Sequence, residues 1–419
     1  MKTVEKKNFF WNMVGTSTNA FTSLFFMIIV VRINGVDQAG LFTFAFSTAS
    51  LLLNIAMYSG RVYQVTERDP QYNGSDFFFT KIITCSIMLL ASILFLVFKD
   101  YTAYKNFIIL TLCIFKLLEG FTEVIYAYIQ NDGKLYQVGI SFTMKSVIGV
   151  VVFLLIDFFT KQLWLACLAL IVNYIIIFLA YDLPNVRKVF KLDRKIRFDK
   201  VFSLLRLGFF TFAIAFLSLY ILNAPKYAID DLLSNDIQTI FGIIMMPATL
   251  IILIAQFILH PYLLHINQML LDNNYKKLVS ITHKLLGIIL GTGVVVLLGS
   301  YFLGIPILNF VYNISLNEYL SSLMIVMLGS VFCATSTILS NILVAMRKTF
   351  QQFIIYILAA VTVFFLSKVF VGSFGIIGAC VTYTAVMILI SFLFEGVFLW
   401  SIHHEKKQLM EPIPMDTKK

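Results

Sequence analysis

The sequence predicts an all-α integral membrane protein with about twelve transmembrane helices in two six-helix lobes. Apolar residues make up 59% of the 419 positions and charged residues only 13%. Soluble globular proteins have roughly 45–50% apolar and about 25% charged residues. This composition excludes a disordered chain and argues strongly against a water-soluble enzyme, because so apolar a chain needs lipid as its solvent.

Twelve apolar runs are each long enough to cross the hydrocarbon core of a bilayer. A helix needs roughly 20 mostly apolar residues to cross about 30 Å of hydrocarbon. The runs are about twice as long as the strands of a membrane β-barrel, which excludes that fold. They cover approximately residues 9–31, 39–60, 77–98, 106–130, 136–158, 162–182, 201–223, 237–260, 281–304, 319–343, 350–371 and 375–402.

The distribution of cations predicts the orientation of these spans. An even number of spans places both termini on one side of the membrane. With this topology 23 of the 32 Lys and Arg residues lie on the side of the termini, and six lie on the opposite side. The positive-inside rule therefore predicts that both termini are cytoplasmic. The same bias accounts for the net charge of +10 without any nucleic-acid partner.

A single long basic segment divides the chain into two halves. Residues 184–200 carry seven Lys and Arg residues and separate six predicted spans from the six that follow. We therefore expect an N-terminal lobe over 1–183, a cytoplasmic linker over 184–200, a C-terminal lobe over 201–402 and a cytoplasmic tail over 403–419. Because each half begins in the cytoplasm, the two lobes fit parallel repeats.

The fourth span carries the clearest polar stripe, formed by Lys116, Glu119, Glu123, Tyr126 and Gln130. Spacings of three and four residues place all five side chains on one helical face. Since charge is costly inside a membrane, this face is expected to look into a cavity or a helix interface. The two glutamates are candidates for ion coupling. The alternative is a structural ion pair within the helix between Lys116 and either glutamate.

Polar residues on other spans extend this candidate cavity lining. Asn12 and Asn19 share a face of the first span, Asn54 and Tyr58 share a face of the second, and Ser141 lies on the fifth. We expect these groups to line a hydrated cavity. The alternative for each is a hydrogen bond that joins two helices, which is common for small polar residues in membranes.

Further ionisable residues lie within or beside the spans. Lys145 has no carboxylate nearby in its own helix, so it is the best candidate for a cation that faces an anion. Arg32, Arg61 and Arg206 lie near span ends, where contact with substrate and snorkelling to lipid headgroups are both possible interpretations. Glu395, in the last span, is a third candidate for ion coupling, and the sequence does not identify its partner.

Motifs for catalysis, metals and cofactors are absent from the sequence. His260 and His265 lack an HExxH frame, and none of the five cysteines forms a CxxC pair. No nucleotide-binding loop or GxSxG motif occurs, and no connection exceeds about 20 residues. We therefore expect no enzyme, no metal site and no cofactor. Transport would draw on an ion gradient or on the gradient of the substrate itself.

Three segments, at residues 223–243, 130–145 and 60–68, resemble motifs of bacterial polysaccharide flippases in the MOP superfamily (multidrug, oligosaccharidyl-lipid and polysaccharide exporters). The segment 223–230 (NAPKYAID), followed by 240–243 (IFGI), is similar to the pattern N-x-P-R-Y-x-I-(D/E) that precedes a short loop and G-(I/V)-F. Lys226 replaces the usual arginine and Thr239 the usual glycine, which keeps the charge but not a bidentate fork. Residues 130–134 (QNDGK) with Ser141 and Lys145 resemble a second motif, and residues 60–61 with Arg68 loosely resemble a third.

This resemblance implies a two-lobed, alternating-access transporter in the bacterial cytoplasmic membrane. Its substrate would be an undecaprenyl-diphosphate-linked oligosaccharide, moved from the cytoplasmic to the outer leaflet. The implied partners are this lipid-linked oligosaccharide and membrane lipids, with a polysaccharide polymerase and glycosyltransferases as further candidates. Cations are needed to bind the diphosphate, and the expected set is Lys145, Lys116, Arg61 and Lys226, with Arg206 and Arg32 as additional candidates.

Two other classes of protein remain as alternatives. A cation-coupled drug or metabolite antiporter of the same architecture would use the acidic residues Glu119, Glu123 and Glu395 to bind ions. A membrane polysaccharide polymerase or ligase is the less favoured alternative. Such an enzyme usually needs a large extracytoplasmic loop, whereas the outer connections here are short and carry six cations in total.

Overall fold

The computed structural model describes residues 2–58, 60–66 and 71–410, and within these ranges every regular element is a helix. Ten described helices are long and apolar enough to cross a membrane. The fold is therefore an all-α, multi-pass membrane architecture, as the sequence predicts. Arg68, part of the third resemblance motif, and residues 411–419 of the predicted tail lie outside the described ranges.

The helices of the first half follow the six predicted spans. The predicted ends agree with the observed ends to within about seven residues, because each apolar run ends at a polar or glycine-containing connection. These helices are α1 (Lys2–Asn34), α2 (Val36–Met57), α3 (Gly60–Thr66), α4 (Gly74–Val97), α5 (Ala103–Asn131), α6 (Leu135–Thr160), α7 (Leu163–Ile177), the π-helical turn η1 (Phe178–Asp182) and α8 (Leu183–Val186).

The second half follows the remaining predicted spans. Its helices are α9 (Phe198–Leu232), α10 (Asn235–Leu259), η2 (His260–Tyr262), α11 (Leu263–Leu271), α12 (Tyr275–Gly299), η3 (Ser300–Gly304), α13 (Ile305–Tyr312), η4 (Asn317–Tyr319), α14 (Leu320–Ala345) and α15 (Thr349–Met410). The helical run over 275–312 is longer than one predicted span, because α12, η3 and α13 follow one another directly.

Two features reconcile the ten apolar helices with twelve spans. The helix α5 has 29 residues but carries three charges at membrane depth, and it is not among the ten. The 62-residue helix α15 contains Gly375 with φ 58° and ψ −134°, where two helices meet at a break. Only glycine adopts this backbone conformation readily. Gly375 therefore separates the two spans that the sequence predicts over 350–371 and 375–402.

The chain forms two compact units. Unit 1 comprises Met1–Gly242 with Val311–Asn313, and unit 2 comprises Ile243–Phe310 with Ile314–Lys419. The helix α9 contacts α2 and α4 and belongs to unit 1. The division into membrane lobes at the basic linker, and the orientation of the termini, remain predictions.

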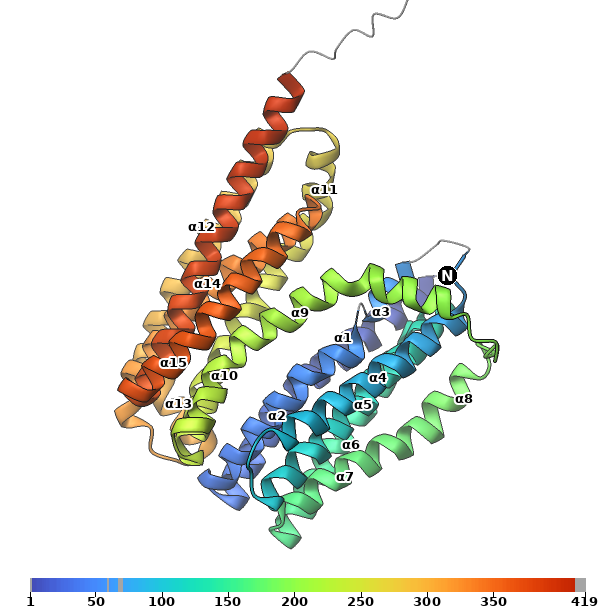
Figure 1. The fold of residues 1–419 in the computed structure, drawn as a ribbon. Coiled ribbons are helices and arrows are strands. Elements are labelled where there is room, and N and C mark those ends of the chain that lie inside the picture. The colour runs from blue at the N-terminus through green and yellow to red at the C-terminus, as the bar shows by residue number, and fades with distance from the viewer. Residues whose placement is uncertain (1, 59, 67–70, 411–419) are drawn as a thin grey trace, which may run out of the picture. The chain divides into compact units, whose positions relative to one another are not determined.

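Unit 1 is a bundle in which α1, α2, α4, α5, α6 and α7 lie side by side (Figure 1). The pair α1 and α6 packs most closely, because glycines face each other across it. A Cβ atom added at Gly15 would lie 2.4 Å from the carbonyl oxygen of Gly139, and one added at Gly139 would lie 2.2 Å from that of Trp11. Small residues allow membrane helices to approach in this way, since lipid supplies no hydrophobic force between them.

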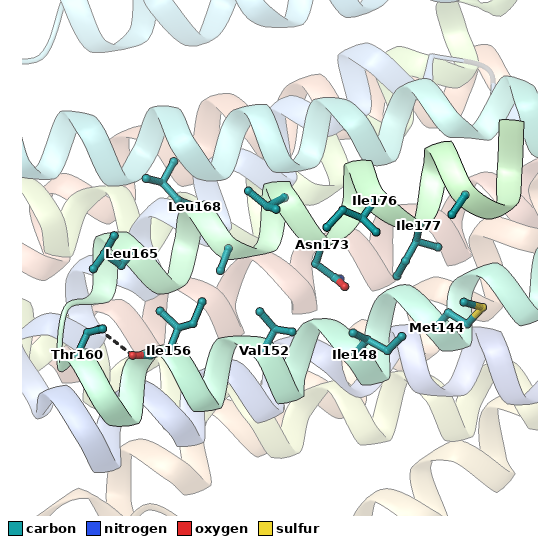
Figure 2. A pocket seen from close by; sticks show the side chains of 13 residues that line it. Met144, Ile148, Val152, Ile156, Thr160, Leu165, Leu168, Asn173, Ile176 and Ile177 are labelled. Atoms are coloured by element: carbon teal, nitrogen blue, oxygen red, sulfur yellow. Dashed lines mark hydrogen bonds between the residues drawn. The ribbon is translucent and has the colours of Figure 1, made fainter.

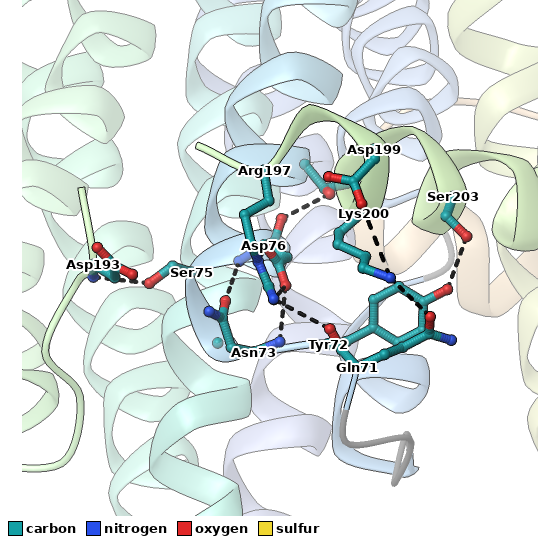
Figure 3. A network of polar contacts seen from close by, with 12 residues as sticks. Gln71, Tyr72, Asn73, Ser75, Asp76, Asp193, Arg197, Asp199, Lys200 and Ser203 are labelled. Atoms are coloured by element: carbon teal, nitrogen blue, oxygen red, sulfur yellow. Dashed lines mark hydrogen bonds and ion pairs between the residues drawn. The ribbon is translucent and has the colours of Figure 1, made fainter. Parts of the chain in front are cut away.

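The basic linker is fastened to the start of α4 (Figure 3). Asn73 and Asp76 form a capping box at this helix N-terminus. The buried Asp76 carboxylate also accepts a hydrogen bond of 3.0 Å from Nε of Arg197, and a second contact comes from the same guanidinium. The backbone N–H of Asp193 donates to the Ser75 hydroxyl at 2.9 Å. The linker is therefore an ordered part of unit 1 and not a free tether.

In unit 2, α14 lies at the centre and contacts both α12 and α15. Glycine again sets the close approach, because a Cβ atom at Gly329 would lie 2.6 Å from the Thr384 hydroxyl. The Thr335 and Ser391 hydroxyls are 2.7 Å apart and join α14 to α15. These two contacts between α14 and α15 are made by glycine and hydroxyl groups.

Candidate functional site

The polar stripe of α5 lies within unit 1 and begins with a local ion pair. Nζ of Lys116 is 2.6 Å from Oε2 of Glu119, one turn further along the helix. The side chains are 12% and 16% exposed, so the pair is mostly shielded. The structure therefore contains the intrahelical ion pair that the spacing allows, and the net charge of these two residues is zero.

Glu123, the next residue of the stripe, forms an ion pair with a residue on a different helix. Nε of Arg61, on α3, lies 3.6 Å from Oε2 of Glu123. The Arg61 guanidinium also lies over the ring of Phe142, 5.7 Å from its centroid. One nitrogen of this guanidinium, Nη1, is buried without a hydrogen-bond partner among the described atoms. Arg61 therefore keeps an unused donor beside the stripe.

Lys145 lies at the centre of a buried polar network. Its ammonium donates to Asp182 at 2.6 Å and to the Tyr126 hydroxyl at 2.7 Å. It also lies 3.8 Å from the centroid of the Tyr174 ring. The Lys145 and Asp182 side chains are only 5% and 1% exposed. The hydroxyl of Ser141, a predicted lining residue, is 2.9 Å from that of Tyr126.

Sequence reasoning missed Asp182 because this residue is 37 positions from Lys145 and belongs to another helix. The only signal in the sequence is an acidic residue at the end of the sixth apolar run. Asp182 ends the π-helical turn η1, and such turns are frequent at functional sites. One of its carboxylate oxygens, Oδ1, is buried without a partner among the described atoms. A buried ion pair with an unused acceptor is a candidate for rearrangement during function.

Lys226 lies on α9, inside the segment that resembles a flippase motif. Its ammonium donates to the Ser47 hydroxyl of α2 at 2.8 Å, and it forms no ion pair with any described carboxylate. Within the predicted cationic set, Lys226 is therefore a mostly shielded cation whose charge is not balanced by an ion pair with a described carboxylate. This contact places the Lys226 ammonium beside the polar face of α2, and its membership of the cationic set remains a prediction.

The end of the same segment is fastened to the connection between α4 and α5. Asp230 accepts hydrogen bonds from Lys105 and, at 2.6 Å, from the Tyr101 hydroxyl. Burial and the hydrogen bond to Asp230 raise the pKa of the Tyr101 hydroxyl above its ordinary value. The neighbouring Asp231 pairs with Lys99. The segment thus anchors α9 at this end through charges that sequence reasoning did not identify as a site.

The remaining predicted lining residues are not gathered at one point. The Asn54 amide donates to the Ser50 carbonyl of its own helix at 3.3 Å, and the Tyr58 hydroxyl donates to the Leu205 carbonyl at 2.6 Å. These bonds match the alternative in which polar groups satisfy the backbone or join helices. Asn12 and Gln130 are half-buried, and Asn19 is exposed.

The other two predicted cations and the last glutamate lie apart from the network around Lys145. Arg206 is exposed, and Arg32 is exposed with its Nε donating to the Val311 carbonyl at 2.9 Å. Glu395 belongs to unit 2, where its Oε1 lies 2.8 Å from Nε2 of His283. The structure thus supplies the partner of Glu395 that the sequence could not identify.

An apolar groove runs between α6 and α7 of unit 1 (Figure 2). Its volume is about 720 Å³, and aliphatic side chains such as Ile148, Val152 and Ile176 line it. Asn173 lies near the middle, where its amide donates to the Lys145 carbonyl at 3.3 Å. The groove suits hydrocarbon, in contrast to the polar network around Lys145 and Asp182.

The geometry defines a multi-pass membrane protein with buried cations and carboxylates in its first unit. No protein-family model matches the sequence. The chain is similar to the capsular polysaccharide biosynthesis protein CapF of Staphylococcus aureus, with 23% identity over 393 residues that cover 90% of this chain and 95% of CapF.

Solved structures of MOP superfamily transporters share the fold. An inward-facing multidrug resistance MATE family transporter has a TM-score of 0.68 at 14% identity and covers 94% of this chain and 99% of its own. The lipid II flippase MurJ, in an inward closed conformation, has a TM-score of 0.67 at 14% identity, with coverages of 98% and 92%. A MOP superfamily transporter from Pyrococcus furiosus has a TM-score of 0.59 at 15% identity, with coverages of 97% and 96%. The fold is therefore that of the MOP superfamily, as the sequence resemblance implies.

Proposed function

We propose that the protein flips an undecaprenyl-diphosphate-linked oligosaccharide from the cytoplasmic to the outer leaflet of the bacterial cytoplasmic membrane. The observation that carries the proposal is the set of shielded cations on a MOP fold: Lys116, Arg61, Lys145 and Lys226. Charge at membrane depth is expensive and is usually retained for a substrate or ion pathway. The similarity to CapF and the shared fold with the lipid II flippase MurJ support this substrate class.

The cations have different kinds of partners, which suggests how a diphosphate would bind. Among the described residues, the hydrogen-bond partner of Lys226 is the neutral Ser47 hydroxyl, and Arg61 keeps one unused nitrogen donor. Lys226 can therefore donate to a phosphate oxygen without first losing a carboxylate partner, and Arg61 can donate through Nη1 while its Nε stays beside Glu123. Lys116 and Lys145 are each neutralised by a carboxylate at 2.6 Å and would exchange that partner for phosphate. Alternating access of the two lobes would then expose the site to each side in turn.

A cation-coupled antiporter is the second candidate, because the MATE transporters share the fold. Two of the three predicted coupling carboxylates, Glu119 and Glu123, face cations of the protein at 2.6 and 3.6 Å. Glu395 instead faces His283, whose charge depends on pH. This pair is the observation that favours ion coupling. It is also compatible with a flippase that draws on a proton gradient.

The test is a flipping assay in vesicles that contain the purified protein and a defined lipid-linked oligosaccharide. We expect Lys226→Ala and Arg61→Ala to reduce the flipping rate at least about tenfold, since each removes roughly 1.4 kcal/mol or more of phosphate interaction. Lys277→Ala, at an exposed lysine outside the predicted cationic set, serves as the control. Wild-type flipping by both cation variants would rule out the cationic site, and export of a drug without flipping would favour the antiporter.

A further inference from the structure

We propose that the groove between α6 and α7 holds the isoprenoid chain of a lipid-linked diphosphate, and that exposed cations at its two ends hold the phosphates in the two leaflets. The identity of the lipid rests on the proposed function. The inference adds a lipid-binding site that is distinct from the buried pair of Lys145 and Asp182.

The chemistry of the groove fits hydrocarbon and not a glycan. Its two polar residues already donate to backbone carbonyls: the Thr160 hydroxyl to Ile156 at 2.7 Å (Figure 2) and the Asn173 amide to Lys145 at 3.3 Å. The walls contain exposed aliphatic side chains, including Ile176 with 58% exposure. The lining therefore offers few hydrogen-bond partners to sugar hydroxyls, and an apolar chain fits it better than a glycan does.

The length of the groove matches the depth of a membrane. On α6 the lining extends from Met144 to Thr160, which spans about 24 Å at 1.5 Å per residue. On α7 and η1 it extends from Leu165 to Ala180, in the opposite chain direction. The hydrocarbon core of a bilayer is about 30 Å thick. The groove therefore spans most of the hydrocarbon core, and it can hold a lipid chain whether the headgroup lies in the cytoplasmic or the outer leaflet.

Exposed cations lie beyond both ends of the groove. Lys161 directly follows Thr160, the last lining residue of α6, and is exposed. Arg187 and Lys188 follow α8, about two helical turns beyond Ala180, and are also exposed. None of these three cations forms an ion pair with a described carboxylate. The predicted topology places Lys161 at the outer surface and the other two at the cytoplasmic surface.

This arrangement complements a lipid with one long chain and a phosphate group at its end. Phosphate would be held by Arg187 and Lys188 before translocation and by Lys161 after it, with the chain in the same groove in both states. A polyisoprenoid diphosphate carries a single chain per headgroup. A bulk phospholipid carries two acyl chains per phosphate, so a single groove fits only part of it.

Photocrosslinking in nanodiscs tests the occupant. A benzophenone amino acid replaces Ile176 in the groove or Leu155, an exposed residue of α6 outside the lining. The nanodiscs contain phosphatidylglycerol with a small fraction of undecaprenyl diphosphate. We expect the probe at Ile176 to capture the undecaprenyl lipid at least about tenfold above its mole fraction, which corresponds to roughly 1.4 kcal/mol. The probe at Leu155 should capture each lipid in proportion to its mole fraction in the nanodisc. Proportional capture at both positions, with phosphatidylglycerol dominant, would overturn the proposal.

Two sets of variants sharpen the result. Val152→Trp should fill the groove and abolish the enrichment, whereas Leu155→Trp should leave it unchanged. The double variant Arg187→Gln and Lys188→Gln should reduce the enrichment several-fold, and Lys277→Gln should not. Unchanged enrichment in Val152→Trp would contradict the groove as the site.

The outcomes also separate this inference from the proposed function. Enrichment at Ile176 without any flipping of a glycan-bearing lipid would retain the groove and refute the flippase. Flipping with proportional capture would retain the flippase and refute the groove. Both measurements use the full-length protein.

Discussion

Replacing Asp182 by Asn would leave the Lys145 ammonium buried without a counter-ion. The two side chains are 1% and 5% exposed, so water provides almost no screening at this site. The Tyr126 hydroxyl at 2.7 Å and the rings of Tyr174 and Phe178 would still stabilise the charge, but no carboxylate would remain in direct contact with it among the described residues. Removing one partner of a buried ion pair typically costs about 3–5 kcal/mol. We expect a loss of this size in the free energy of unfolding of unit 1.

Removing both charges should behave differently from removing one. Replacement of a buried ion pair by apolar residues of similar volume is often neutral or stabilising, by about 1–4 kcal/mol. The double variant Lys145→Met and Asp182→Leu should therefore recover most of the stability that Asp182→Asn loses. If Lys145 also binds phosphate, the double variant should fold but flip the substrate at least about tenfold more slowly than the wild type.

The assay combines denaturant unfolding in detergent micelles with flipping in vesicles, at equal amounts of folded protein. An unfolding midpoint for Asp182→Asn equal to that of the wild type would refute the reasoning from burial. Wild-type flipping by the double variant would show that the pair is structural. The charge-swapped variant Lys145→Asp and Asp182→Lys adds a second check, because it restores the pair but moves the cation from α6 to η1.

Three further changes test other contacts in unit 1. Asp230→Asn weakens two hydrogen bonds to a buried carboxylate and should cost about 1.5–3 kcal/mol in thermal unfolding; an unchanged melting temperature would contradict this anchor. Gly139→Val places a Cβ atom 2.2 Å from the Trp11 carbonyl and should destabilise the bundle by about 1–3 kcal/mol, whereas Gly287→Val, with no atom within 4 Å of the added Cβ, should cost less. Asp76→Ala removes a capping box and the carboxylate that holds the linker, so trypsin should cleave within 187–200 several-fold faster; cleavage at the wild-type rate would show that other contacts order this segment.

Local features of the candidate site follow from the sequence. A spacing of three residues is enough to predict that Lys116 can reach Glu119, and the pair is present at 2.6 Å. The stripe on α5 is likewise a consequence of helical periodicity. The sequence also identified Lys226, which occupies the position of the motif arginine. It did not predict the contact of Lys226 with Ser47, which lies 179 residues away in the chain.

Asp182 shows why the rest of the site required the structure. Nothing in the residues around Lys145 indicates which of the other helices supplies its carboxylate, because periodicity describes the faces of one helix and not its neighbours. The pairing depends on how α6 packs against α7 and on the π-helical turn that ends at Asp182. The pairing of Arg61 with Glu123 depends in the same way on how α3 packs against α5.

The sequence by itself determined that this chain is a helical membrane protein with twelve apolar runs, and which charges lie at membrane depth. Length and polarity decide those properties, since a bilayer accepts only long apolar helices and penalises every exposed charge. Tertiary structure decided which cations are neutralised, which keep unused donors, and where an apolar groove lies between helices. These properties depend on distances between side chains that are remote in the sequence, and only the packing of the helices fixes such distances.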